Sequence, residues 1–190
     1  MLGAVAVKIT DFMERHGVFE SDDKEIYFFG AQQGLVFALN LATLIFVGII
    51  LGAFWHVLVF TLAFMPLRSF AGGYHSSTQL KCYISSTAMV VIVALVTRFV
   101  VINSLVVSVM LLMFAAVIML MSPVGNKNKP LDDLEVKIYR KKARIICAVE
   151  LLVAIIFLII GVSYITTGIF WAFAVIALLL VLEKLFSGKN

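Results

Sequence analysis

Long apolar runs separated by short polar breaks make up most of the chain. Between Ile26 and Leu67 there is no Asp, Glu, Lys or Arg, and one helix of that length would extend about 63 Å, twice the ~30 Å hydrocarbon thickness of a bilayer. We therefore expect this run to fold back between Gly48 and Gly52. The whole pattern predicts six membrane-spanning helices, the second of them short and limited by Pro66, near residues 34–51, 53–67, 82–97, 104–121, 145–161 and 165–182.

The first 25 residues follow a different pattern. Val5, Ile9 and Phe12 recur at steps of three and four residues, with charged residues between them. That spacing is typical of an amphipathic helix, and such a helix lies in the membrane interface rather than across it. Residues 1–25 are thus expected to form an interfacial helix.

Composition agrees with this picture. The mean hydropathy is +1.10, 63% of the 190 residues are apolar and 14% are charged, well below the usual quarter for globular proteins. We expect an all-α, polytopic integral membrane protein with about six transmembrane helices, forming a single domain over residues 1–190. The two cysteines form no CxxC, and no HExxH is present, so neither a metal nor another cofactor is expected.

Positive charge is distributed unevenly along the predicted spans. With six spans, the two termini and the segments 68–82 and 122–144 share one side of the membrane, and fourteen of the fifteen Lys and Arg residues fall there; only Arg98 falls opposite. The positive-inside rule places that side in the cytoplasm. The basic patch at 137–144 is expected to touch anionic lipid headgroups rather than nucleic acid.

Three polar side chains fall inside the apolar runs. Asn40 and His56 are each expected to act as interhelical hydrogen-bonding groups. Glu150 lies about one turn inside the fifth run, and we expect it to pair with a basic residue near the interface.

Candidate chemistry is concentrated in the polar interruption between residues 68 and 82, which holds His75 and Cys82. A cysteine thiolate is a strong nucleophile, and a nearby imidazole can serve as its base. On one straight helix the two residues would be about 10.5 Å apart along the axis, too far for proton transfer. A bend is therefore required, and Gly72 and Gly73 supply one. The residues 76–78 are candidate N-caps for a helix that puts Cys82 in or just after its first turn, where the helix dipole favours a thiolate. The alternative is an ordinary loop in which a histidine and a cysteine fall seven residues apart by chance.

Two short motifs in this order resemble those of the accessory gene regulator B (AgrB) family, membrane peptidases of Gram-positive quorum sensing. The first reads Arg68…Ala71-Gly72-Gly73-Tyr74-His75…Cys82, and the second reads Ser122-Pro123…Asn126…Lys129-Pro130-Leu131. The resemblance extends along nearly the whole chain. It implies a multi-pass protein of the plasma membrane, with a cytoplasmic catalytic loop, in a system that produces an autoinducing peptide and regulates virulence.

The resemblance further implies a cysteine endopeptidase that removes the C-terminal part of a small amphipathic propeptide, AgrD-like, through an acyl-enzyme. A side chain of the peptide then closes a thiolactone or lactone ring. Matched by position, Cys82 is the nucleophile and His75 its base. Residues expected to bind substrate or support the site are Arg68, Gly72, Gly73, Tyr74, Gln79, Lys129 and Pro130.

Some roles stay open at this point. Arg68 is suited either to a two-pronged hydrogen bond with a substrate carboxylate or to anchoring a phosphate or a carbonyl group. Gly73 is expected to give backbone clearance, and Gln79 or a group from residues 126–133 to assist the dyad. The rival function is a small peptide transporter or exporter without proteolytic chemistry; a third is a scaffold or sensor subunit. Small subunits of this kind often pair, so a homodimer is considered as well.

Overall fold

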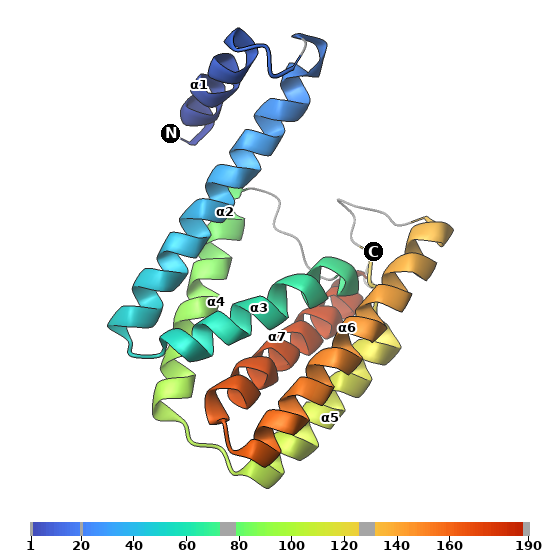
Figure 1. Cartoon of the computed structure of the whole chain (residues 1–190). Helices are drawn as coiled ribbons and strands as arrows, with labels where there is room; N and C mark the ends of the chain where they lie inside the picture. Colours follow the sequence, from blue (N-terminus) through green and yellow to red (C-terminus); the bar gives the residue numbers. More distant parts are fainter. Residues whose placement is uncertain (1, 20, 73–78, 126–131, 188–190) are drawn as a thin grey trace.

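The computed structural model describes residues 2–19, 21–72, 79–125 and 132–187, and within these ranges the chain is almost entirely helical (Figure 1). The elements in chain order are α1 (Leu2–Arg15), a 3₁₀ turn η1 (Ser21–Asp23), α2 (Lys24–Ile50), α3 (Phe54–Ala71), α4 (Gln79–Phe99), α5 (Ser104–Met121), α6 (Asp133–Ile160) and α7 (Ser163–Ser187).

The helices confirm the prediction of an all-α, polytopic membrane protein. Five of them, α2, α3, α5, α6 and α7, are long and apolar enough to cross a membrane. Each of the six predicted runs coincides with one of the helices α2 to α7 and extends beyond it by no more than one residue. The remaining helix that matches a predicted run is α4. Its apolar part within the described residues, Tyr83–Phe99, is shorter than those of the other five.

Several helices are longer than the apolar runs suggested, and α2 begins at Lys24, ten residues before the predicted span. α3 continues through Pro66 to Ala71 instead of stopping near 67, as membrane helices tolerate proline where neighbouring helices pack against them. α6 begins at Asp133, so the basic patch at 137–144 is helical rather than part of a loop. A capping box starts α6 because the Asp132 side chain accepts a hydrogen bond from the Glu135 N–H at 2.6 Å and the Glu135 side chain accepts one from the Asp132 N–H.

The core of the bundle lies around α7. α3 and α7 make the most extensive helix contact, and Gly168 is what lets them approach: a Cβ there would lie 2.7 Å from Val59 Cγ1 and 3.0 Å from the Phe60 nitrogen. α5 and α6 pack on the same helix (Figure 1). Large side chains with almost no exposed surface fill the space, among them Phe60, Leu67, Leu111, Ile118, Phe170, Phe173, Ile176 and Leu180.

A polar connection joins α2 and α4, which run side by side at the edge of the bundle (Figure 1). Ser86 Oγ donates to Asn40 Oδ1 at 2.7 Å, and the hydroxyls of Thr43 and Tyr83 lie 2.8 Å apart. The prediction that Asn40 is an interhelical hydrogen-bonding group is confirmed.

α1 folds back on the beginning of α2 as a 14-residue helix, shorter than the expected 1–25. The small side chains of Ala6 and Thr10 are buried, and Lys24 pairs with Asp11 at 2.8 Å and Glu14 at 2.6 Å. The apolar residues that predicted amphipathicity, including Val5 and Phe12, stay exposed. Their exposure suits an interfacial helix, and that location stays a prediction.

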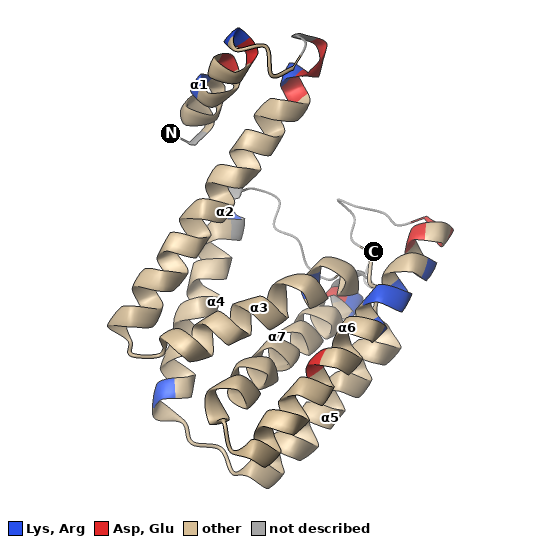
Figure 2. Cartoon of the chain, viewed as in Figure 1, with Lys and Arg blue, Asp and Glu red and all other residues tan. Residues whose placement is uncertain are grey.

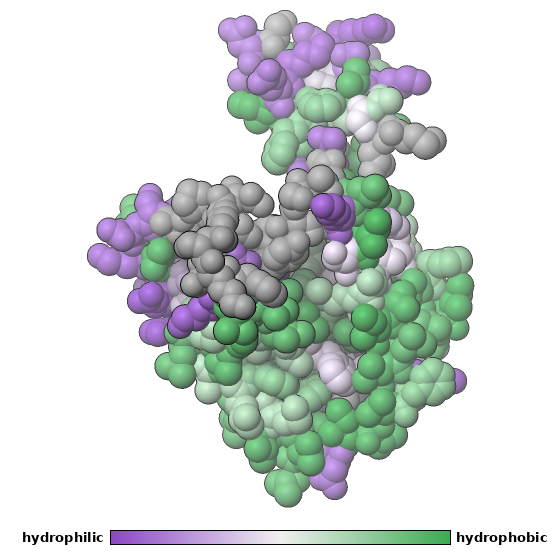
Figure 3. Space-filling model, turned by 180° about the vertical axis from the view of Figure 1, so that it is seen from behind, coloured by the Kyte–Doolittle hydropathy of each residue, from purple (hydrophilic) through white to green (hydrophobic). Residues whose placement is uncertain are grey.

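Charged residues gather at one end of the bundle, where α3 and α7 end and α6 begins (Figure 2). We call this the charged end. The opposite end, formed by the connections at 51–53, 100–103 and 161–162, is called the far end. Apolar side chains cover the body of the bundle between them on the face shown in Figure 3.

Candidate functional site

Of the two residues of the predicted dyad, the structure describes the backbone of Cys82 but not His75. His75 lies outside the described residues, together with Gly73, Tyr74, Lys129 and Pro130. Cys82 is the fourth residue of α4, in the first turn of that helix, and Gln79 is the first. The pairing of His75 with Cys82 therefore stays a prediction, while the backbone position of Cys82 at the beginning of a helix is defined.

The end of α3 is fastened by Arg68 and Gly72. The Arg68 guanidinium donates from Nη1 to the Gly72 carbonyl, so this nitrogen anchors the backbone. Gly72 has φ +78° and ψ −151°, a region that only glycine adopts readily. It forms a β-bridge with Val124, whose N–H donates to the Ala71 carbonyl at 3.0 Å. A Cβ on Gly72 would overlap the Val124 carbonyl oxygen, so this close approach requires glycine.

The basic part of α6 packs on the same end of α3. Lys142 Nζ lies 4.9 Å from the centre of the Phe70 ring, and the Tyr139 ring meets Phe70 edge-on at 5.7 Å. Arg144 Nε donates to the Met119 carbonyl at 3.1 Å. The structure thus brings residues 68–72 of the first motif, Val124 of the second segment and the basic part of α6 together at the charged end.

Glu183 is a buried acidic residue near the candidate site that the sequence did not single out. It lies in the last two turns of α7, the helix that ends at the charged end, and is only 7% exposed. Leu180, one turn before it, belongs to the same buried cluster as Ala71, and Val124 packs against that cluster. The sequence did contain a signal for it, because Glu183 directly follows the long apolar run that ends at Leu182.

The expected ion pair of Glu150 is not found among the described residues. Its Oε2 is buried and has no hydrogen-bond partner there, because α6 turns this side chain toward the interior of the bundle rather than toward the basic first turns of the helix. Cys147, one turn earlier, is a buried free thiol, as a cysteine used as a small apolar residue would be.

An apolar groove of about 400 Å³ lies between α4 and α7, two helices that make little contact with each other. On α4 it is lined at three- and four-residue steps by Ser85, Met89, Ile92 and Val96. Helical register places position 82 on the same row, one turn before Ser85. On α7 the lining residues are Trp171, Ala174, Val175, Leu178 and Leu179.

Comparison with known proteins identifies the family. The family model described as accessory gene regulator B matches residues 6–188, nearly the whole chain. No curated protein and no solved structure gives a match. The matched range includes both sequence motifs and all of the helices at the charged end. This chain belongs to the accessory gene regulator B family, which places it among the membrane proteins of agr quorum sensing.

Proposed function

We propose that this chain is a membrane cysteine endopeptidase that processes an AgrD-like propeptide, with Cys82 as nucleophile and His75 as its base. The observation that carries the proposal is the family match over residues 6–188. It is supported by the position of Cys82 in the first turn of α4, because the N-terminal end of a helix favours a thiolate over a thiol.

The reaction has two steps. The Cys82 thiolate attacks the carbonyl carbon of the scissile peptide bond, and the C–N bond breaks as the leaving amine takes a proton from the His75 imidazolium. The propeptide is then held as a thioester. A thiol or hydroxyl of the same peptide attacks the thioester carbonyl, its proton returns to His75, and the Cys82 thiolate leaves as a thiolactone or lactone ring closes.

Ring closure competes with hydrolysis of the thioester, so the site must exclude water. The groove between α4 and α7 is apolar and begins one turn after position 82. Such a surface suits the apolar face of an amphipathic propeptide and keeps its C-terminal part near the nucleophile.

We place the charged end in the cytoplasm of a Gram-positive cell, since with six spans fourteen of the fifteen Lys and Arg residues fall on its side of the membrane. Arg68 and Gly72 support the site through the backbone contacts described above, and we assign Gly73, Tyr74, Gln79, Lys129 and Pro130 to the same region by their sequence positions. The reaction needs one chain, and a homodimer would be compatible with it.

The test is co-expression with an AgrD-like propeptide, with the released C-terminal peptide and the acyl-enzyme measured by mass spectrometry. We expect cleavage by the wild-type protein and none by Cys82→Ala or His75→Ala. Cys147→Ala is the matched control, because Cys147 is a buried thiol inside α6, and it should cut as the wild type does. Equal cleavage by Cys82→Ala and wild type would exclude the peptidase and favour the transporter.

A further inference from the structure

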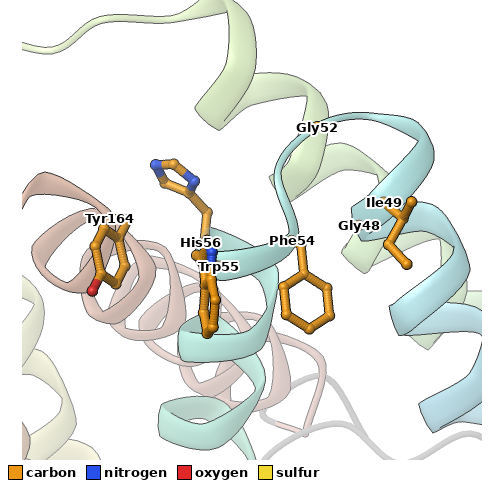
Figure 4. A pocket seen from close by; sticks show the side chains of 7 residues that line it. All are labelled: Gly48, Ile49, Gly52, Phe54, Trp55, His56 and Tyr164. Carbon is orange, nitrogen blue, oxygen red and sulfur yellow. The ribbon is translucent and has the colours of Figure 1, made fainter.

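The far end of the bundle has a pocket of about 440 Å³ that the proposed peptidase does not use. It lies where α2 turns into α3 and where α7 begins, and it is lined by Gly48, Ile49, Gly52, Phe54, Trp55, His56 and Tyr164 (Figure 4). His56 and Tyr164 border the same hollow, with their ring centres 6.3 Å apart.

Arg98, at the end of α4, brings a positive charge to this pocket. Its Nη1 would lie 3.2 Å from a Cβ at Gly52, so the guanidinium rests against a residue that lines the pocket. Gly52 has φ +62° and closes the turn between α2 and α3. Glycine therefore serves both the turn and the approach of the arginine.

Among the described residues, no negative charge balances Arg98 at the far end. None of the eleven Asp and Glu residues lies in the connections at 51–53, 100–103 and 161–162, and the structure pairs Arg98 with no carboxylate within the residues it describes. Arg98 is the basic residue in the last turn of α4, and the rest of the ribbon at this end is tan in Figure 2. The imidazole of His56 adds a hydrogen-bond donor at the pocket, and the Tyr164 ring borders it with its hydroxyl turned away from the imidazole (Figure 4).

The surroundings of the pocket suit a lipid rather than a soluble anion. Trp55 is 60% exposed and Ile49 64% exposed, so an apolar surface continues from the pocket along the outside of α2 and α3. Trp and Tyr side chains are typical of the level of lipid headgroups. A headgroup phosphate in the pocket would leave its acyl chains along this surface.

We propose that the far-end pocket binds the phosphate of an anionic phospholipid through Arg98 and His56, with the rings of Trp55 and Tyr164 beside it. The bound lipid holds the turn between α2 and α3 at the membrane surface. This site is separate from the peptidase chemistry and does not depend on it.

The test uses Trp55 as a reporter in a Trp171→Phe background, which removes the other tryptophan. The full-length protein is placed in phosphatidylcholine nanodiscs that contain an equal small fraction of brominated phosphatidylglycerol or brominated phosphatidylcholine, and Trp55 quenching is measured. We expect phosphatidylglycerol to associate about five-fold more strongly than phosphatidylcholine, because one Lys or Arg near the membrane surface favours an anionic lipid by about that factor. Arg98→Gln should reduce this preference to about one, and Arg98→Lys should retain most of it.

Lys137→Gln is the matched control, because it removes one positive charge at the charged end and should leave the preference unchanged. Size-exclusion elution and helical circular dichroism establish that each variant is folded. An unchanged preference in Arg98→Gln, its loss in Arg98→Lys, or an equal loss in Lys137→Gln would each overturn the proposal. Inorganic phosphate, added at constant ionic strength, should have no effect; if it abolishes the preference, the site binds free phosphate and the lipid assignment is wrong.

Discussion

Gly72 shows how much a single residue decides at the charged end. Its φ of +78° and its close approach to Val124 exclude any side chain, and its carbonyl accepts a hydrogen bond from Arg68. One position thus joins the end of α3, the segment after α5 and an arginine of the first sequence motif.

We predict that Gly72→Ala lowers stability by about 1–3 kcal/mol, the usual range for a backbone forced into a rare conformation. The measurement is thermal unfolding of the purified protein in detergent, with propeptide cleavage as a second readout. Gly34→Ala is the control, because a Cβ there meets nothing within 4 Å and alanine is the better helix former. Equal behaviour of the two variants would contradict the assigned role of Gly72.

Glu150 and Glu183 allow a second comparison at the residue scale. Glu150 Oε2 is buried with no hydrogen-bond partner in the described part of the chain, whereas Glu183 takes part in a polar interaction. Removing an unsatisfied buried group recovers about 1–3 kcal/mol. Glu150→Leu should therefore raise the unfolding temperature and Glu183→Leu should lower it. A lower unfolding temperature for Glu150→Leu would show that its carboxyl group is satisfied.

At the scale of elements, the helix that carries Cys82 is positioned through α2. The hydrogen bonds from Ser86 to Asn40 and between Tyr83 and Thr43 lie within the first two turns after Cys82. On its other side α4 borders the groove and makes little contact with α7. The polar contacts with α2 therefore hold α4 in place near its beginning.

A double-mutant cycle tests this connection. For Asn40→Ala and Ser86→Ala we expect a coupling energy of about 0.6 kcal/mol, the average for such bonds between membrane helices, measured by unfolding in detergent. Ser108 supplies the control, because its hydroxyl bonds to the Ser104 carbonyl in its own helix. Asn40→Ala and Ser108→Ala should be additive. Additivity in the Asn40 and Ser86 pair as well would show that the bond does not couple α2 to α4.

At the scale of the whole molecule, charge separates the two ends of the bundle (Figure 2). The charged end holds the contact between the end of α3 and the segment after α5, and the far end holds the pocket beside Arg98. Because cationic residues remain on the cytoplasmic side during insertion, this asymmetry predicts which end faces the cell interior.

Cysteine labelling in intact cells checks that orientation, starting from a Cys82→Ala, Cys147→Ala background. Val101→Cys at the far end, where Val101 is 99% exposed, should react with a membrane-impermeant maleimide. Asp133→Cys, exposed at the beginning of α6, should react only after the cells are opened. The reverse result would place the candidate active site outside the cell.

The sequence by itself determined what depends on local pattern. Apolar runs of about the length needed to cross a bilayer predicted the helices, and the longer run between Ile26 and Leu67 predicted the reversal between Gly48 and Gly52. Both are present. The polar side chain of Asn40 in an apolar run predicted a partner on another helix, and Ser86 is that partner. The two motifs predicted the family, which the match over 6–188 shows.

Only the tertiary structure decided which distant segments meet. The sequence around Gly72 does not identify Val124 as its neighbour, and the sequence around Gly52 does not identify Arg98. In each pair the two residues are far apart in the sequence and meet only when the helices pack. The predicted ion pair of Glu150 was wrong for the same reason. Hydropathy gives the depth of a residue in the membrane, whereas the direction in which its side chain points depends on how the helices pack.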